Sequence, residues 1–124
     1  YGFIPHTLSD DGDPCDVIVL NPTPVVPGCV IRSRPIGVLK MTDEAGGDEK
    51  ILAVPVDKIL SLYTQWQKPE DLNPFRLKTI AHFFEHYKDL EEGKWVKVEG
   101  WEGPESAQKE IMDGIANYKK EQSA

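Results

Sequence analysis

Residues 10–16, "DDGDPCD", place four carboxylates in seven positions and lead directly into the apolar run "VIVL". Like charges this close repel one another, and Asp is disfavoured in strands, so the crowding needs a reason. A divalent cation would supply one, because Mg²⁺ and Mn²⁺ prefer oxygen ligands and neutralise neighbouring carboxylates. The spacing does not fit an EF-hand calcium loop, which needs a glycine at position six and a glutamate at position twelve.

A second acidic stretch, "MTDEAGGDEK" at 41–50, carries Asp43, Glu44, Asp48 and Glu49 and ends in Lys50. Gly46-Gly47 predicts a turn, so these acids would project from the tip of a hairpin. Either acidic stretch alone is interpreted equally well as a solvated loop. Two of them, each beside an apolar strand, favour a shared cation site.

A Mg²⁺ ion is seldom held by protein ligands alone and usually bridges to substrate phosphates, so the acidic stretches indicate a phosphate-containing ligand. Such a ligand also needs cationic partners, and Lys50 and Lys88 are the candidates. Taken singly, each lysine is interpreted more simply as a solvated side chain.

The elements that must position these residues change character along the chain. The runs 16–20, 28–41 and 50–56 are rich in β-branched residues and predict strands, and the prolines of "NPTPVVPG" between the first two predict a loop or an edge. The run 94–101 predicts a further strand.

Two helices are predicted in the second half. Residues 73–92 carry apolar residues at helical spacing, with Asn73 as N-cap and Pro74 at the first position. Another helix begins near Pro104, and Gly114 lies in its middle. The apolar stripes are Leu77, Ile80, Phe84 and Tyr87 in the first, and Ala107, Ile111, Ile115 and Tyr118 in the second.

Composition bounds the class of protein. The 124 residues, of which 40% are hydrophobic and 28% charged, predict one soluble domain over 1–124. The net charge of −7 argues against nucleic acid or an anionic membrane as partner. No apolar run reaches the roughly 18 residues of a membrane span. Cys15 and Cys29 cannot form a disulfide framework and predict free buried thiols in a reducing cytoplasm.

The motifs together resemble those of the soluble family I inorganic pyrophosphatases of bacteria. "DGDPCDVIVL" is similar to the family's D-G-D-P-x-D-V motif, and "GVLKMTDEAGGDEKILAVP" and "IAHFFEHYKDLEEGKWVKVEGW" resemble its later blocks. The resemblance covers essentially the whole chain, in family order. It implies an α+β, mainly β fold, with an OB-like five-stranded barrel flanked by two helices.

The resemblance also implies Mg²⁺-dependent hydrolysis of pyrophosphate to two phosphates, with Mn²⁺ or other divalent ions as alternatives, in a protein that assembles as a homo-oligomer, usually a hexamer. Asp13 would be the general base for the attacking water. The other implied roles are metal ligands at Asp11, Asp16, Asp43 and Asp48, and substrate contacts at Tyr1, Lys50, Tyr87 and Lys88.

One departure from the family concerns the start of the chain. Family members carry an upstream segment with barrel strands and further basic substrate groups, so this chain resembles their C-terminal portion. The barrel is then expected to be incomplete, Tyr1 to be mobile, and residues 1–124 alone to have little hydrolytic activity. A metal-binding fragment without turnover is the corresponding alternative.

Two other classes remain open from the residues alone. "HFFEH" at 82–86 matches the H-x-x-E-H pattern of inverted zinc peptidases, although a solvated helix face is the stronger interpretation. An OB-like barrel can also be a non-catalytic binding module, with Trp66, Trp95 and Trp101 as stacking platforms. The negative net charge disfavours a nucleic-acid groove.

Overall fold

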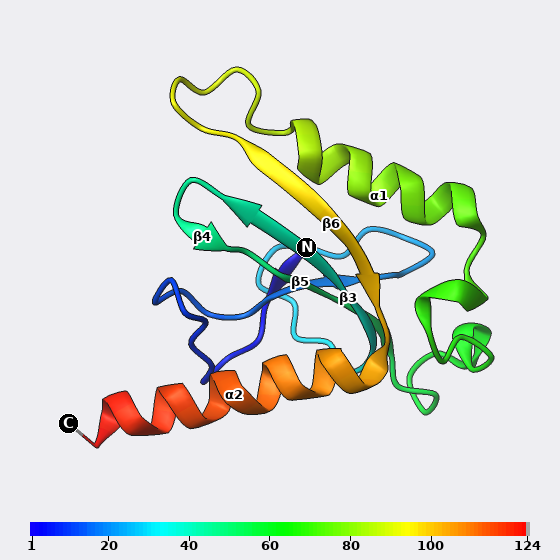
Figure 1. Ribbon diagram of the computed structural model, residues 1–124. Helices are drawn as coiled ribbons and strands as arrows, with labels where there is room; N and C mark the ends of the chain where they lie inside the picture. The colour runs from blue at the N-terminus through cyan, green and yellow to red at the C-terminus, as the bar shows by residue number, and fades with distance from the viewer. Residues whose placement is uncertain (124) are drawn as a thin grey trace.

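The chain folds into one mixed β-sheet with two long helices packed against it (Figure 1). The computed structural model describes residues 1–123. Two single-turn 3₁₀ helices, Ser61–Tyr63 and Pro69–Asp71, lie between the last strand of the first half and the first long helix. The elements are β1 (Gly2–Phe3), β2 (Asp16–Val19), β3 (Ser33–Asp43), β4 (Gly46–Gly47), β5 (Lys50–Pro55), α1 (Pro74–His86), β6 (Val96–Glu102) and α2 (Pro104–Gln122).

The sheet order is β1-β2-β5-β3-β4, and β6 also pairs with β3. Strands β2 and β5 run parallel, with Asp16 opposite Lys50, and every other pair is antiparallel. Within residues 1–123, β1 does not pair with β6, so the sheet stays open rather than closing into a barrel. No helix in this part of the chain is long and apolar enough to cross a membrane.

Each face of the sheet is covered by its own helix, because successive strand residues point to opposite faces. Ile51 and Ala53 of β5 are buried in one cluster with Ala107 of α2. Leu52, which lies between them, is buried in a different cluster that Ile80 of α1 covers. The sheet therefore has an α1 face and an α2 face, and consecutive residues of a strand point alternately to one and the other.

The prediction of a strand over 28–41 is wrong at both ends. Strand β3 begins at Ser33 and continues to Asp43. Gly28 has a φ of +88°, a left-handed conformation that does not belong to a strand. The prolines of the preceding loop thus keep the chain irregular for longer than β-propensity alone indicates.

The helix predicted over 73–92 begins as expected but ends earlier. The Asn73 side chain accepts a hydrogen bond from the Phe75 N–H, which confirms the predicted cap. After His86 the chain turns tightly, with the Asp89 N–H donating to the His86 carbonyl. Leu90 is fully exposed, so nothing apolar holds this segment in a helix. Tyr87 and Lys88 therefore lie just beyond α1 and not on it.

Gly114 in α2 is required by packing, although glycine weakens a helix interior. A Cβ built there would come within 2.6 Å of the Cys15 Sγ and 3.2 Å of the Thr7 Cβ. We expect Gly114→Ala to destabilise the protein by about 1 to 3 kcal/mol, because the overlap outweighs the roughly 1 kcal/mol gain in helix propensity. Urea unfolding measures this. The loss should shrink when Cys15 is also changed to Ala, and an equal loss in both backgrounds would contradict the steric cause.

Candidate active site

The predicted acidic residues meet near one end of the sheet, on the α1 face. Asp16 opens β2 and Lys50 opens the parallel strand β5, directly opposite it. Asp43 ends β3, and Asp48 lies in the short connection from β4 to β5. The Asp48 N–H donates to the Met41 carbonyl, which holds this connection against β3. Strand pairing thus brings together residues that are far apart in the sequence.

Lys50 is the centre of this group. Its side chain is 3% exposed, and its Nζ lies 2.6 Å from Asp16 Oδ2 and 2.9 Å from Asp48 Oδ1. Burial alone would lower the pKa of Lys50, but the hydrogen bonds to Asp16 and Asp48 outweigh it and raise the pKa well above its ordinary value. The ammonium therefore stays charged and neutralises two carboxylates at once.

The two partners of Lys50 differ in their surroundings. Asp48 is the more buried, and this burial raises its pKa despite the opposing hydrogen bond from Lys50. The charges of Asp43 and Asp16 act in the same direction as burial, because like charges disfavour ionisation. A bound cation would stabilise the ionised form of Asp48 against both burial and the neighbouring negative charges. The electrostatics of the site therefore favour binding of positive charge.

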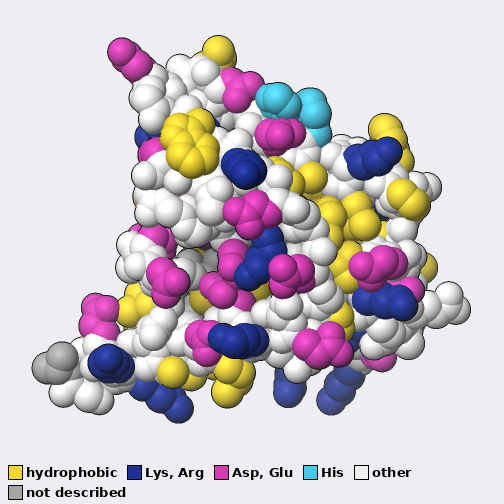
Figure 2. Space-filling view, in the orientation of Figure 1, with side chains coloured by type: hydrophobic (Ala, Val, Ile, Leu, Met, Phe, Trp, Pro, Cys, Tyr) yellow, Lys and Arg dark blue, Asp and Glu magenta, His cyan; other side chains and the backbone are white. Residues whose placement is uncertain are grey.

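A second ion pair lies beside the first. Lys88 Nζ contacts Asp43 Oδ2 at 3.0 Å and Glu44 Oε1 at 3.7 Å. Burial of Asp43 tends to raise its pKa, but hydrogen bonds from Lys88 and from the Ala45 N–H outweigh it and lower the pKa. The tight turn after α1 is what carries Lys88 to the hairpin tip. On the side of the molecule seen in Figure 2, acidic and basic side chains are interspersed.

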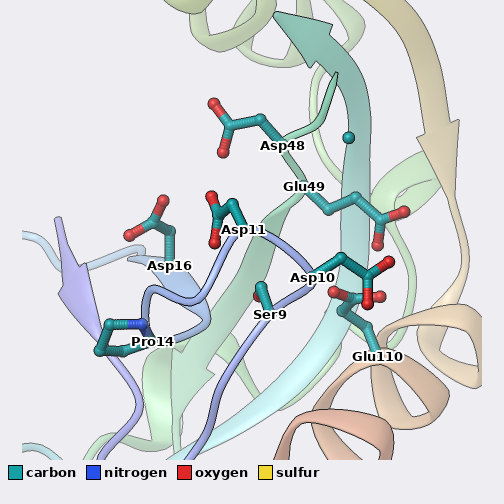
Figure 3. A pocket seen from close by; sticks show the side chains of 9 residues that line it. Ser9, Asp10, Asp11, Pro14, Asp16, Asp48, Glu49 and Glu110 are labelled. Carbon is teal, nitrogen blue, oxygen red and sulfur yellow. The ribbon is translucent and has the colours of Figure 1, made fainter. Parts of the chain in front are cut away.

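The loop 9–16 forms the other wall. Asp11 Oδ1 accepts a hydrogen bond from the Asp13 N–H at 2.9 Å, which shapes the turn. One pocket is lined by Asp11, Asp16 and Asp48, and its lining also includes Ser9, Asp10, Pro14, Gly47, Glu49 and Glu110 (Figure 3). Asp11 and Asp16 of the first acidic stretch thus line one pocket with Asp48 of the second. Asp13 is exposed and does not belong to the lining, so its role as a base stays a prediction.

Aromatic rings border the lysines. The Tyr1 ring packs against Phe84 with centroids 5.6 Å apart, and Lys50 Nζ lies 5.5 Å from the Tyr1 centroid. Tyr87 packs edge-on against Phe84, and Lys88 Nζ lies 5.6 Å from the Tyr87 centroid. Cations above aromatic faces are stabilised by the ring quadrupole. Tyr1 therefore lies beside Lys50, and Tyr87 lies beside Lys88, as substrate contacts at one site would require. The Tyr1 ring packs against Phe84.

The carboxylate oxygens of the pocket suit a hard divalent cation, although the predicted metal ligands are not yet close enough together to coordinate one. Asp11, Asp16 and Asp48 present only oxygen ligands to the pocket, as Mg²⁺ and Mn²⁺ require. Among residues 1–123 as they stand, no three His, Cys, Asp or Glu side chains are grouped closely enough to hold a metal ion. Lys50 engages one oxygen each of Asp16 and Asp48, so an incoming cation competes with its ammonium.

Sequence reasoning missed a group on the opposite wall of this pocket. The sequence predicts no role for Glu49 or Asp10 beyond membership of an acidic stretch, yet both line the pocket with Glu110 of α2. Lys40 of β3 contacts Glu49. Strand alternation from Lys50 could have placed Glu49 on the α2 face, but no local pattern singles out Glu110.

The alternative zinc site in "HFFEH" gains no support from the geometry. His82 and His86 stack with ring centroids 4.3 Å apart, and His86 Nδ1 lies 2.9 Å from Asp89 Oδ2. The side chains of Glu85 and His86 are about half exposed. These contacts are those of a solvated helix face, as predicted.

The tryptophans do not form a common stacking platform. Trp66 stacks on Tyr63 at 4.2 Å and packs against the core, and Trp101 is also half-buried against the core. Trp95 alone of the three is exposed.

The expectation of two buried thiols is wrong for Cys29, which is exposed, whereas Cys15 is buried.

The comparisons with known proteins agree on one family. The inorganic pyrophosphatase family model matches residues 1–119. The inorganic pyrophosphatase of Bradyrhizobium diazoefficiens is 60% identical over 120 residues, which are 97% of this chain and 67% of that protein. The corresponding protein of Pseudomonas aeruginosa is 59% identical, with 97% and 69% covered.

Solved structures give the same result. The inorganic pyrophosphatase of Helicobacter pylori superposes with a TM-score of 0.91 at 47% identity, over 94% of this chain and 69% of that chain. This similarity confirms the mainly β, OB-like fold with two helices. The chain spans about two thirds of the length of these relatives. With a family model over nearly its full length and relatives of about 60% identity, this chain belongs to the inorganic pyrophosphatase family.

Proposed function

We propose that this protein hydrolyses inorganic pyrophosphate to two phosphates in a reaction that depends on Mg²⁺, with Mn²⁺ or another divalent ion as a possible substitute. The observation that carries the proposal is the pocket lined by Asp11, Asp16 and Asp48, with the buried Lys50 bridging two of these carboxylates. An all-oxygen site beside fixed lysines suits a metal–phosphate ligand.

The metal ligands in this proposal are Asp11, Asp16, Asp48 and the neighbouring Asp43. Divalent ions bound there would lower the pKa of a water and offset phosphate charge. Asp13, on the exposed rim of the loop, accepts the proton of the attacking water as its oxygen bonds to phosphorus. The bridging P–O bond breaks, and the departing phosphate takes the electron pair.

The cationic side of the site holds the phosphate oxygens. Lys50 and Lys88 are both largely buried and both kept charged by carboxylate partners, so they offer positive charge to the transition state. Tyr1 and Tyr87 lie beside them and offer hydroxyl groups to the same oxygens. Positioning and electrostatics together supply most of the catalysis in phosphoryl transfer.

Residues 1–124 alone are expected to hydrolyse pyrophosphate far more slowly than a full-length relative. A large apolar groove, lined by Phe3, Val17, Ile51 and Met112 among others, lies open between the sheet and α2, and the open sheet leaves the site less rigidly held. A site held loosely loses catalytic power, by about a hundredfold for a misplacement near 1 Å.

Phosphate release from Mg²⁺-pyrophosphate tests the proposed function. We expect a slow reaction that EDTA abolishes and Mg²⁺ restores, at least about a hundredfold below the Pseudomonas aeruginosa relative measured in parallel. Equal rates would contradict the prediction of weak activity. Metal binding without any phosphate release would support the alternative of a non-catalytic metal-binding fragment, and binding of oligonucleotides would support a binding module.

We also infer a homo-oligomer, a hexamer for the full-length bacterial protein, located in the cytoplasm. Large apolar side chains are exposed on and after α1, where a subunit contact would bury them: Phe75, Phe83, Leu90 and Trp95. The free thiols Cys15 and Cys29 suit a reducing compartment.

A further inference from the structure

Three side chains on the α2 side of the candidate pocket form a partly buried ionic contact. Lys40 Nζ of β3 lies 2.5 Å from Glu49 Oε1, and their side chains are 30% and 20% exposed. Glu110 of α2 approaches from the other side. We name Lys40, Glu49 and Glu110 the anchor, because they join both strands of the acidic hairpin to the helix that covers them.

The anchor lies beside the short connection between β4 and β5. Strand β5 pairs with β3 as far as Lys50, and β4 pairs with β3 again at Gly47. Between these two positions, the Asp48 N–H donates to the Met41 carbonyl. Glu49 follows Asp48 in this connection, outside both strands, and its side-chain contact with Lys40 adds a second link to β3 beside two predicted site residues.

Strand alternation links the anchor to the site. Asp48 and Lys50 flank Glu49 and point to the opposite face, so fixing Glu49 fixes the backbone from which both project. Figure 3 shows the Glu49 carboxylate directed away from Asp48 and toward the side of the pocket where Glu110 lies.

The second oxygen of Glu49 shows how much this carboxylate depends on Lys40. Glu49 Oε2 is buried and has no hydrogen-bond partner among the described residues. Burial, followed by the interaction with Glu49, raises the pKa of Glu110 to about 7. A buried oxygen without a partner is costly, so the ion pair of Glu49 Oε1 with Lys40 is the contact that keeps the carboxylate in place.

We propose that Lys40 is a positioning residue: through its contact with Glu49 it holds Asp48 in the geometry that binds the divalent ion. The inference rests on the proposed metal-dependent function, but it concerns residues outside the predicted ligand set. Lys40 itself touches neither metal nor substrate.

The sign of the effect on metal affinity separates positioning from simple electrostatics. Lys40→Met removes a positive charge near an acidic site, so electrostatics alone would tighten Mn²⁺ binding. Loss of positioning weakens it instead, and we expect a dissociation constant about tenfold higher, the usual effect of removing a supporting residue. Lys40→Arg should restore most of the affinity, and Lys40→Gln, a milder change, should weaken binding in the same direction.

Mn²⁺ binding to residues 1–124, followed by titration calorimetry without pyrophosphate, measures this independently of turnover. Exchange of the Asp48 amide, followed by NMR, should quicken in Lys40→Met while amides of α1 stay protected. Lys119→Met is the control, because Lys119 is exposed in the last turn of α2, more than two helical turns beyond Glu110. Unchanged or tighter Mn²⁺ binding in Lys40→Met overturns the anchor alone, whereas a parent chain that binds no Mn²⁺ contradicts the metal-dependent function as well.

Discussion

Lys50→Met is expected to abolish measurable phosphate release by residues 1–124 and at the same time to tighten Mn²⁺ binding at least about tenfold. Catalysis is lost because a buried cation no longer faces the phosphate oxygens, and one such group is worth about a hundredfold or more. Affinity rises because the ammonium that holds Asp16 and Asp48, at 2.6 and 2.9 Å, no longer competes with the metal.

The same substitution should change stability in a metal-dependent way. Removing one partner of a buried ion pair costs about 3 kcal/mol, because the remaining charges are left without compensation. We therefore expect Lys50→Met to lose stability of that order in EDTA and to regain most of it in excess Mn²⁺, since the ion replaces the ammonium between the carboxylates.

Thermal or urea unfolding with and without Mn²⁺ gives the stability, and titration calorimetry gives the affinity. Lys109→Met removes the same charge from an exposed pair and should leave both quantities nearly unchanged. If Lys50→Met bound Mn²⁺ more weakly than the parent chain, the carboxylates that Lys50 bridges would not be the metal ligands.

Asp16→Asn is expected to weaken Mn²⁺ binding by more than about a hundredfold, the opposite sign to Lys50→Met. Asp16 lines the pocket and is a direct metal ligand in the proposed function, so its loss exceeds the 10- to 100-fold effect of changing a supporting residue. The amide retains the size of the side chain and can still accept a hydrogen bond from Lys50. The loss of stability in EDTA should therefore be only about 1 to 2 kcal/mol.

Asp113→Asn makes the same chemical change on an exposed position of α2 and serves as the control. Calorimetry with Mn²⁺ separates the two outcomes, and phosphate release should fall with affinity in Asp16→Asn. A variant that keeps parent-like Mn²⁺ affinity would remove Asp16 from the ligand set, even if its hydrolysis were impaired.

Local patterns were sufficient to predict most elements. Helix α2 follows from Pro104 and its apolar stripe, and the start of α1 follows from Asn73, because caps and periodicity act within a few residues. The start of β3 was missed because the preceding loop stays irregular beyond its prolines, and the end of α1 because nothing apolar holds the residues after His86 in a helix. The sequence places Gly114 in the middle of α2 without a reason, and the reason is the close approach of Cys15.

For the candidate site, too, the sequence predicts some features and not others. The acidic residues and lysines could be selected from the sequence because repelling carboxylates beside strands call for a cation. Their pairing could not be predicted, since Asp16 meets Lys50 only through parallel strands and Lys88 meets Asp43 only through the turn after α1. No local pattern singles out Glu110, because its importance comes from Glu49, which is distant in the sequence.

By itself, the sequence determined the kinds of group present, their attachment to strand ends and helix ends, and the family to which the chain belongs. Tertiary structure alone decided which charges compensate one another: Lys50 between two carboxylates on the α1 face, and Lys40 with Glu49 on the α2 face. The physical reason is that periodicity and capping are short-range, whereas the energy of a buried charge depends on every neighbour that folding brings within a few ångströms.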